Sequence, residues 1–200
     1  MPSSDIQSVV LASGNAGKLR ELRRILKPLQ FSLISQSEFS VPDVEENGLS
    51  FIENAIIKAR ATTKVTGLPA IADDSGLEVD YLRGAPGIYS ARYSGKGDAA
   101  NNAKLLSELG DLPMQQRTAR FQCVLVYMRH WQDPTPIVCQ GTWEGQILFQ
   151  ISGENGFGYD PLFYVPSHQC SSAQLSTEVK NSISHRAKAS ATLLEALSQH

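Results

Sequence analysis

A short apolar run that gives way to helical periodicity is the feature that most constrains how this chain folds. Val9 to Ala12 is rich in β-forming residues and ends at Ser13-Gly14-Asn15, and from Leu19 onward apolar residues recur at the spacing of a helix. This order of strand, turn and helix is the building unit of α/β proteins. We therefore expect an α/β fold.

The rest of the chain repeats and extends this pattern. Ser50-x-x-Glu53 is a capping box that opens a helix, and Ser184 is expected to cap a closing helix. A buried strand over 69–72 delivers Asp73-Asp74-Ser75-Gly76, after which a return strand is expected over 77–81. A helix is expected over 99–109, and the β-type runs 118–128 and 136–143 predict an antiparallel hairpin. The sheet should be mixed.

Composition limits the classes of partner. The chain has 18 Lys plus Arg against 20 Asp plus Glu, so we expect binding neither to nucleic acid nor to an anionic membrane. The longest apolar stretch, near 123–128, is too short to span a bilayer, and Met1 to Asp5 lacks the character of a signal peptide. The three cysteines form no CxxC pair. We expect a cytoplasmic protein with one domain, residues 1–200.

The turn after the first strand has the ingredients of a phosphate-binding loop. Its glycines let backbone N–H groups turn toward an anion, and a lysine stands at the start of the helix. It is not a Walker A loop, because Ala12 and Leu19 stand where that motif needs Gly and Ser or Thr. An ordinary connecting turn remains the alternative. The candidate phosphate ligands are Ser13, Gly14, Asn15, Ala16, Gly17 and Lys18.

Two acidic segments are candidates for a metal site. Asp73 and Asp74 follow a buried strand, at the sheet edge where α/β proteins usually bind ligands, and adjacent strand residues point to opposite faces. Glu45 and Glu46 precede a helix. The scattered histidines make a zinc site improbable, whereas carboxylates suit Mg²⁺. An Asx-turn that ends the strand is the alternative for the aspartates.

Two later segments carry rings and cations. Residues 153–161 are dense in glycine and aromatics and offer a ring that could stack on a base, although a tight turn with core aromatics is the alternative. Lys180, His185 and Arg186 gather near a helix N-terminus, where the dipole disfavours cations. This favours an anionic or carbonyl-rich ligand, and a solvated charged face is the alternative.

Taken in order, these motifs resemble the inosine triphosphate pyrophosphatase family, also called the Ham1 or RdgB family, and its bacterial dITP/XTP pyrophosphatase branch most of all. The resemblance spans about residues 10–196. It rests on Ser13-Gly14-Asn15-x-x-Lys18, Glu45 through Glu53-Asn54-Ala55, Ala72-Asp73-Asp74-Ser75-Gly76-Leu77, Gly84-Ala85-Pro86-Gly87, Phe157-Gly158-Tyr159-Asp160-Pro161 and Ser184-His185-Arg186.

The resemblance implies the ITPase-like (Maf/Ham1) fold, a long mixed β-sheet flanked by helices with two lobes around an active-site cleft, and a homodimer. It implies that Asp74 is the catalytic carboxylate and a Mg²⁺ ligand together with Glu45, with Glu46 left open as the alternative. Ser13, Asn15 and Lys18 would bind the triphosphate. The remaining substrate contacts would come from Ser75, Phe157, Gly158, Tyr159, Asp160, Lys180, His185 and Arg186.

The reaction expected from the resemblance is hydrolysis of ITP, dITP or XTP to the monophosphate and pyrophosphate. A water activated by Asp74 or by the metal would attack the α-phosphorus, while Lys18 and Lys180 neutralise the leaving group. A donor from His185 or Arg186 would favour 6-keto purines over adenine. No residue in the sequence accounts for rejection of GTP.

Three rival functions remain open at this point. A Maf-like pyrophosphatase would act on pyrimidine or modified nucleotides, but the full motif set argues against it. A catalytically silent nucleotide sensor would keep the pocket without turnover, and the joint presence of Lys18, Glu45 and Asp74 argues against that. A nucleic-acid-binding module is weaker still, because the charge balance provides no extended basic face.

Overall fold

The computed structural model describes residues 7–29 and 31–198, so the N-terminal residues that argued against a signal peptide lie outside the described residues. Within these ranges no helix is both long and apolar enough to cross a bilayer. The chain divides into two compact units. Unit 1 comprises the residues up to Asp74, Cys123–Gly141 and those from Lys188 onward, and unit 2 comprises Ser75–Gln122 and Thr142–Ala187.

The strands form one seven-stranded sheet in the order β2-β1-β3-β4-β5-β6-β7. β1 pairs in parallel with both β2 and β3, whereas β5-β6 and β6-β7 are antiparallel, so the predicted mixed sheet is confirmed. The strands are β1 Ser8–Ala12, β2 Ser32–Ser35, β3 Ala70–Val79, β4 Thr118–Met128, β5 Ile137–Ile147, β6 Phe163–Val165 and β7 Cys170–Ser171.

The helices confirm the capping signals in the sequence. Ser50 Oγ accepts from Glu53 N at 3.3 Å at the start of α2, and Ser184 Oγ accepts from Ala187 N at 3.2 Å at the start of α5. The α-helices are α1 Ala16–Ile25, α2 Phe51–Thr66, α3 Asp98–Leu109, α4 Thr177–Ile183 and α5 His185–Ser198. Short 3₁₀ helices cover Lys27–Leu29, Gln36–Phe39, Asp80–Leu82, Gly87–Arg92, Met114–Gln116, Pro166–His168 and Ser172–Gln174.

The predicted return strand at 77–81 is wrong. β3 runs without a break from Ala70 to Val79, and Gly76 does not adopt the positive φ of a turn. The Asx-turn reading of the aspartates fails for the same reason, because Asp73 and Asp74 lie inside the extended strand. Their carboxylates accept from Cys123 and Lys58, which lie far from them in sequence.

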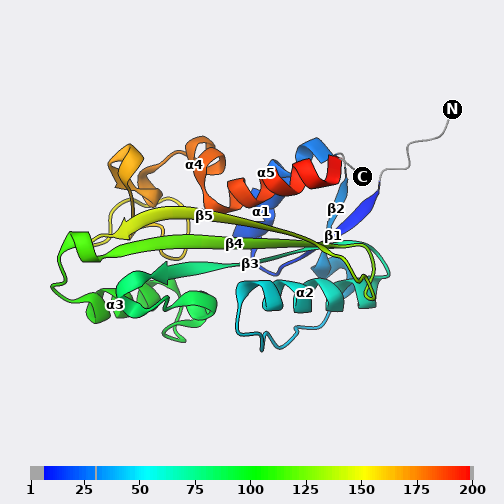
Figure 1. Ribbon diagram of the computed structural model, residues 1–200, viewed down its shortest axis with the longest axis horizontal. Helices are drawn as coiled ribbons and strands as arrows, with labels where there is room; N and C mark the ends of the chain where they lie inside the picture. Colours follow the sequence, from blue (N-terminus) through cyan, green and yellow to red (C-terminus); the bar gives the residue numbers. More distant parts are fainter. Residues whose placement is uncertain (1–6, 30, 199–200) are drawn as a thin grey trace. The chain divides into compact units, whose positions relative to one another are not determined.

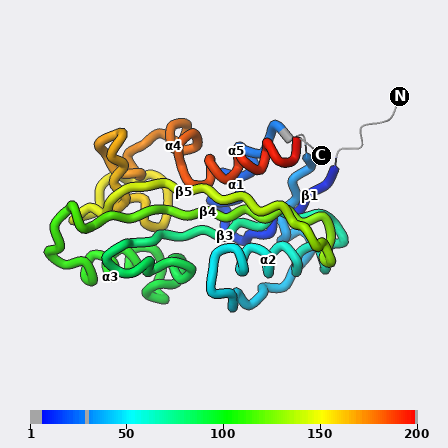
Figure 2. Tube along the Cα trace, in the orientation of Figure 1, coloured from blue at the N-terminus to red at the C-terminus, as the bar shows by residue number. Residues whose placement is uncertain are grey.

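The core of unit 1 has two layers because side chains alternate along its strands. One face of the sheet carries Leu11, Ile71 and Leu125, which pack with Leu22 of α1 and Leu193 of α5. Figures 1 and 2 show α1 and α5 on that side and α2 on the other. The opposite face packs against α2 through small and medium side chains: Ala12, Ala55, Ala59, Ala72, Val124, Val126 and Met128.

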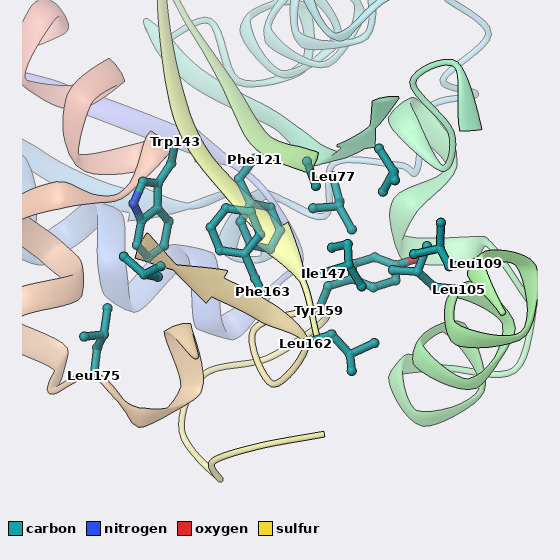
Figure 3. Close-up of a cluster of buried hydrophobic side chains, with 13 residues drawn as sticks. Leu77, Leu105, Leu109, Phe121, Trp143, Ile147, Tyr159, Leu162, Phe163 and Leu175 are labelled. Carbon is teal, nitrogen blue, oxygen red and sulfur yellow. The ribbon is translucent and has the colours of Figure 1, made fainter. Parts of the chain in front are cut away.

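Unit 2 has its own core, which is built largely from aromatic rings. Phe121 lies 4.5 Å from Phe163 and Trp143 lies 5.2 Å from Phe163 between ring centroids. Figure 3 shows Leu105 and Leu109 of α3 beside Tyr159, at the other end of the same cluster. This packing fixes α3 against the segment that carries Phe157 to Asp160.

Candidate active site

The loop after β1 is organised by its own asparagine. Asn15 is the N-cap of α1, and its Oδ1 accepts from Gly17 N at 2.9 Å and from Lys18 N at 3.1 Å. Asn15 N in turn donates to Ser13 Oγ at 3.2 Å. A Cβ at Gly14 would meet no atom within 4 Å, so there is open space beside the backbone at this one position of the loop. The loop presents the N-terminus of a helix, which favours an anion.

The two aspartates of β3 point to opposite faces, as the strand period predicts. On the α1 face, Lys18 forms an ion pair with Asp73, whose side chain is fully buried. Asp73 also accepts from Cys123 Sγ at 3.2 Å. The Lys18 side chain remains 17% exposed, so this ion pair is only partly shielded from solvent.

On the α2 face, Asp74 meets a residue that the sequence did not single out. Lys58 Nζ lies 2.7 Å from Asp74 Oδ1 and 3.3 Å from Glu46 Oε2. Asp74 Oδ2 is buried and has no hydrogen-bond partner within residues 7–29 and 31–198. Glu46 thus shares a cation with Asp74, whereas Glu45 is exposed and forms no ion pair with the described part of the chain.

Burial and charge act in opposite directions on this pair. Burial raises the pKa of Asp74, and the nearby ammonium groups of Lys58 and Lys18 offset that effect only in part. For Lys58, burial by itself lowers the pKa, but attraction to Asp74 and then to Glu46 outweighs it, so the pKa is raised. Asp74 is therefore a carboxylate whose proton affinity exceeds that of an ordinary aspartate, beside a lysine that stays charged.

In unit 2, Phe157 stands at the surface above a buried ion pair. Lys180 Nζ lies 2.6 Å from Asp160 Oδ2, and both residues are at least nine-tenths buried. Asp160 Oδ2 also accepts from Phe157 N at 2.9 Å, and Asp160 Oδ1 accepts from Ser172 Oγ at 2.9 Å. Phe157 is 37% exposed, and Lys180 Nζ lies 5.2 Å from the centroid of its ring. The ring is therefore accessible for stacking. Asp160 holds the backbone of Phe157 by accepting the hydrogen bond from Phe157 N.

Arg186 and His185, in the first turn of the closing helix, differ in their surroundings. Arg186 is 1% exposed, donates to Ser75 Oγ at 3.1 Å and places its guanidinium 6.0 Å from the Phe157 ring centroid. His185 is also buried, but its ring stacks on Phe121 at 4.8 Å between centroids. Together with the burial of Lys180, this shows that the alternative of a solvated charged face is wrong.

Comparison with known proteins identifies the family of this chain. The sequence profile of the Ham1 family matches residues 9–196. The chain belongs to the Ham1 family. Two relatives, from Photobacterium profundum and Escherichia coli O157:H7, are each 58% identical over 194 residues, which is 96% of this chain and 98% of theirs. Both are named dITP/XTP pyrophosphatase.

Solved structures agree with the family assignment. A HAM1 protein from Coxiella burnetii matches with a TM-score of 0.91 and 49% identity, over 98% of this chain and 100% of that one. A nucleoside-triphosphatase / dITP/XTP pyrophosphatase from Mycobacterium abscessus matches with a TM-score of 0.77 and 42% identity, over 96% of this chain and 100% of that one. The ITPase-like α/β fold expected from the motifs is therefore confirmed.

Lys58 is a candidate site residue of this Ham1 family member that sequence reasoning missed. It lies on α2 next to the buried Ala59, but Arg60 flanks Ala59 on the other side with the same charge, so the sequence does not distinguish the two cations. Nothing local indicates that it reaches Asp74, 16 residues away. The sequence leaves Glu45 and Glu46 as alternatives for the metal ligand, and of the two only Glu46 forms an ion pair with Lys58 within the described residues.

The carboxylates of this Ham1 family member fit a magnesium ion. An unpartnered buried carboxylate oxygen on Asp74 is costly unless a cation or donor meets it. No group of three or more His, Cys, Asp or Glu side chains is suited to a metal within the part of the chain that the structure describes. Mg²⁺ does not need such a group, because it usually takes one or two carboxylates and completes its shell with water and phosphate oxygens.

Proposed function

We propose that this protein hydrolyses the non-standard purine nucleoside triphosphates ITP, dITP and XTP to the monophosphate and pyrophosphate, and so removes them from the nucleotide pool. The observation that carries the proposal is the state of Asp74, which is buried with Oδ1 on Lys58, while Oδ2 has no hydrogen-bond partner among the described residues. The family and the names of its relatives support the substrate class.

Asp74 acts as the catalytic carboxylate. It takes a proton from the attacking water as the water oxygen bonds to the α-phosphorus, and the bond from that phosphorus to the β-phosphate oxygen breaks. Pyrophosphate leaves with the electron pair. Lys58 favours the ionised form of Asp74, because its charge is the largest influence that opposes the rise of the Asp74 pKa caused by burial.

The loop after β1 contacts the triphosphate. Asn15 holds the first turn of α1 in shape, so that its role is to present the loop as well as to touch the phosphates. Lys18 exchanges Asp73 for a phosphate oxygen on binding, since both partners offer an anionic oxygen to the same ammonium. The residues in this set are Ser13, Gly14, Asn15, Ala16, Gly17 and Lys18.

Magnesium is the cofactor in this proposal. Asp74 and one glutamate of the loop before α2, Glu45 or Glu46, would hold it. Glu46 is the better placed of these two glutamates because Lys58 pairs with both Glu46 and Asp74. When bound, Mg²⁺ neutralises phosphate charge and makes water more acidic.

The base is recognised by residues of unit 2. Phe157 stacks on the purine, and Arg186 donates to the 6-keto oxygen, since its guanidinium lies beside the Phe157 ring while His185 stacks on Phe121. Adenine offers an amino group at that position and is rejected. Ser75, Gly158, Tyr159, Asp160, Lys180 and His185 complete and shape this part of the site.

The remaining expectations belong to the same proposal. Residues 1–200 act as one pyrophosphatase domain built from the two units. The protein is a cytoplasmic homodimer that binds neither nucleic acid nor membrane. The three cysteines are free thiols, two of them buried, which supports a reducing compartment.

Pyrophosphate release from ITP, dITP, XTP, ATP, GTP and dTTP, each with Mg²⁺ and with a chelator, tests the proposal. Release that depends on Mg²⁺ and favours the first three nucleotides supports it. A preference for dTTP would instead indicate a Maf-like enzyme. Binding of ITP without release in any condition would indicate a nucleotide sensor.

A further inference from the structure

The stacking ring is carried by backbone that has little stiffness of its own. Phe157 stands between Gly156 and Gly158, whose φ angles are 83° and 62°. Glycine reaches these angles easily but also leaves them easily, because no Cβ restricts it. A ring that must stand ready for a base therefore needs contacts that fix both glycines.

Asp160 fixes the first side. A Cβ at Gly156 would collide with the Asp160 carboxylate, so the two are in close contact. The same carboxylate accepts from Phe157 N and from Lys180. This support is local, because Gly156, Phe157 and Asp160 belong to one short turn. Asp160 connects that turn to the buried Lys180.

Helix α3 fixes the second side. Gly158 N donates to Asp98 Oδ2 at 2.7 Å, and Gly158 O accepts from Asn102 Nδ2 at 2.9 Å. Both peptide groups of this glycine are thus held by side chains one helical turn apart on α3. Asn102 Nδ2 also donates to Asp98 O at 3.0 Å, and Asn102 is 3% exposed, so its amide is fixed in direction.

The helix itself is firmly anchored in unit 2. Leu105 and Leu109 pack in the core beside Tyr159, which Figure 3 shows. Tyr159 OH donates to Ser90 O at 2.9 Å. The first turn of α3 therefore gives the Phe157 segment a rigid support rather than a second flexible loop.

We propose that Asp98 and Asn102 are positioning residues for base recognition, which they support by clamping Gly158 and thereby setting the Phe157 ring. The inference deepens the proposed function and rests on it. Stacking contributes to the ground state and the transition state alike, so loss of the clamp raises KM and leaves kcat nearly unchanged. A ligand without a base is insensitive to the clamp.

The experiment compares Asp98→Ala, Asp98→Asn and Asn102→Leu with wild type. For each, KM and kcat are measured for ITP, and Ki is measured for inorganic triphosphate, a competitor with no base. Asp98→Ala and Asn102→Leu are expected to raise KM about tenfold, with Ki changed less than about twofold. Asp98→Asn keeps an oxygen acceptor for Gly158 N, so its KM is expected to stay near the wild-type value.

Lys104→Met is the matched control on the same helix. Its ammonium donates to Tyr93 O and does not touch the Phe157 segment, so both constants should stay at wild-type values. Circular dichroism checks folding, and the exposed Asp98 provides a variant pair that decides the question if Asn102→Leu does not fold.

Equal rises of KM and Ki, or an unchanged KM in Asp98→Ala and Asn102→Leu, would overturn the inference. Wild-type protein that releases no pyrophosphate from ITP would contradict the proposed function instead. In that case the dissociation constant of IMP, measured by calorimetry, replaces KM in the same comparison, and an unchanged value in both variants overturns the clamp.

Discussion

Lys58 Nζ lies 2.7 Å from Asp74 Oδ1, so that α2 delivers a cation to the carboxylate at the centre of the proposed chemistry. Asp73, the preceding residue, meets Lys18 of α1 on the other face. Two adjacent aspartates therefore have different cations and different surroundings. Asp73 is fully buried in its ion pair with Lys18, whereas Asp74 Oδ2 has no hydrogen-bond partner within the described part of the chain.

Removal of the Lys58 charge should shift the acid limb of the pH profile. Burial raises the Asp74 pKa and Lys58 opposes that rise, so Lys58→Met raises it further. Because Asp74 acts as the ionised base, kcat/KM decreases when the pH is lowered and Asp74 is protonated. In Lys58→Met this decrease should begin at a higher pH than in wild type. The profile is measured with Mg²⁺ and ITP. Lys64 is an exposed lysine on the same helix, and Lys64→Met should leave the acid limb of the profile unchanged.

Asp74→Asn should strongly reduce turnover without unfolding the protein. Loss of the base is expected to lower kcat by roughly 10² to 10⁴. The amide is similar in size, and ionised Asp74 is disfavoured by burial, so a single cooperative unfolding transition should remain. Pyrophosphate release and thermal unfolding check the two expectations. A folded variant with near-native turnover would show that Asp74 is not the base.

Arg117 should be the arginine of unit 2 on which stability depends most. It is fully buried and donates to the carbonyl groups of Gly110, Ile147 and Leu148 at 2.8 to 3.0 Å. Arg117→Met leaves these acceptors without a donor and should lower the free energy of unfolding by about 3 kcal/mol. Urea unfolding measures the loss.

Arg120→Met is the comparison for Arg117→Met. Arg120 pairs with Asp80 and Glu144, whose side chains are 44% and 67% exposed, and such surface ion pairs contribute about 1 kcal/mol or less. Equal losses in the two variants would contradict the distinction between them.

Asp133 should make stability depend on pH in the acid range. Hydrogen bonds from Arg129 hold the pKa of this buried carboxyl well below its usual range. A carboxyl whose pKa is lowered by folding stabilises the protein above the unfolded-state pKa, about 3.9, and loses that contribution as the pH falls through the lower folded-state value. The stability difference between wild type and Asp133→Asn should therefore shrink between pH 5 and about pH 3. A difference that grows over this range would exclude the mechanism.

Much of the architecture was determined by the sequence because it depends on short-range patterns. The strand period and the helical spacing place β1 and α1, and the serines at 50 and 184 cap α2 and α5 as predicted. The same strand period assigns Asp73 and Asp74 to opposite faces. The order and spacing of the motifs identified the family, because both can be read from the sequence without knowledge of tertiary contacts.

Only the tertiary structure decided which side chains meet. Lys58 reaches Asp74 across 16 positions, and Asp98 reaches Gly158 across 60, and neither contact leaves a local pattern. The unbroken β3 was missed because Asp-Asp-Ser-Gly has the composition of a turn, while sheet pairing and buried partners hold it extended. Burial of Lys180 and Arg186 has the same origin: Asp160, Ser75 and the Phe157 ring compensate charges that a helix N-terminus by itself would leave in solvent.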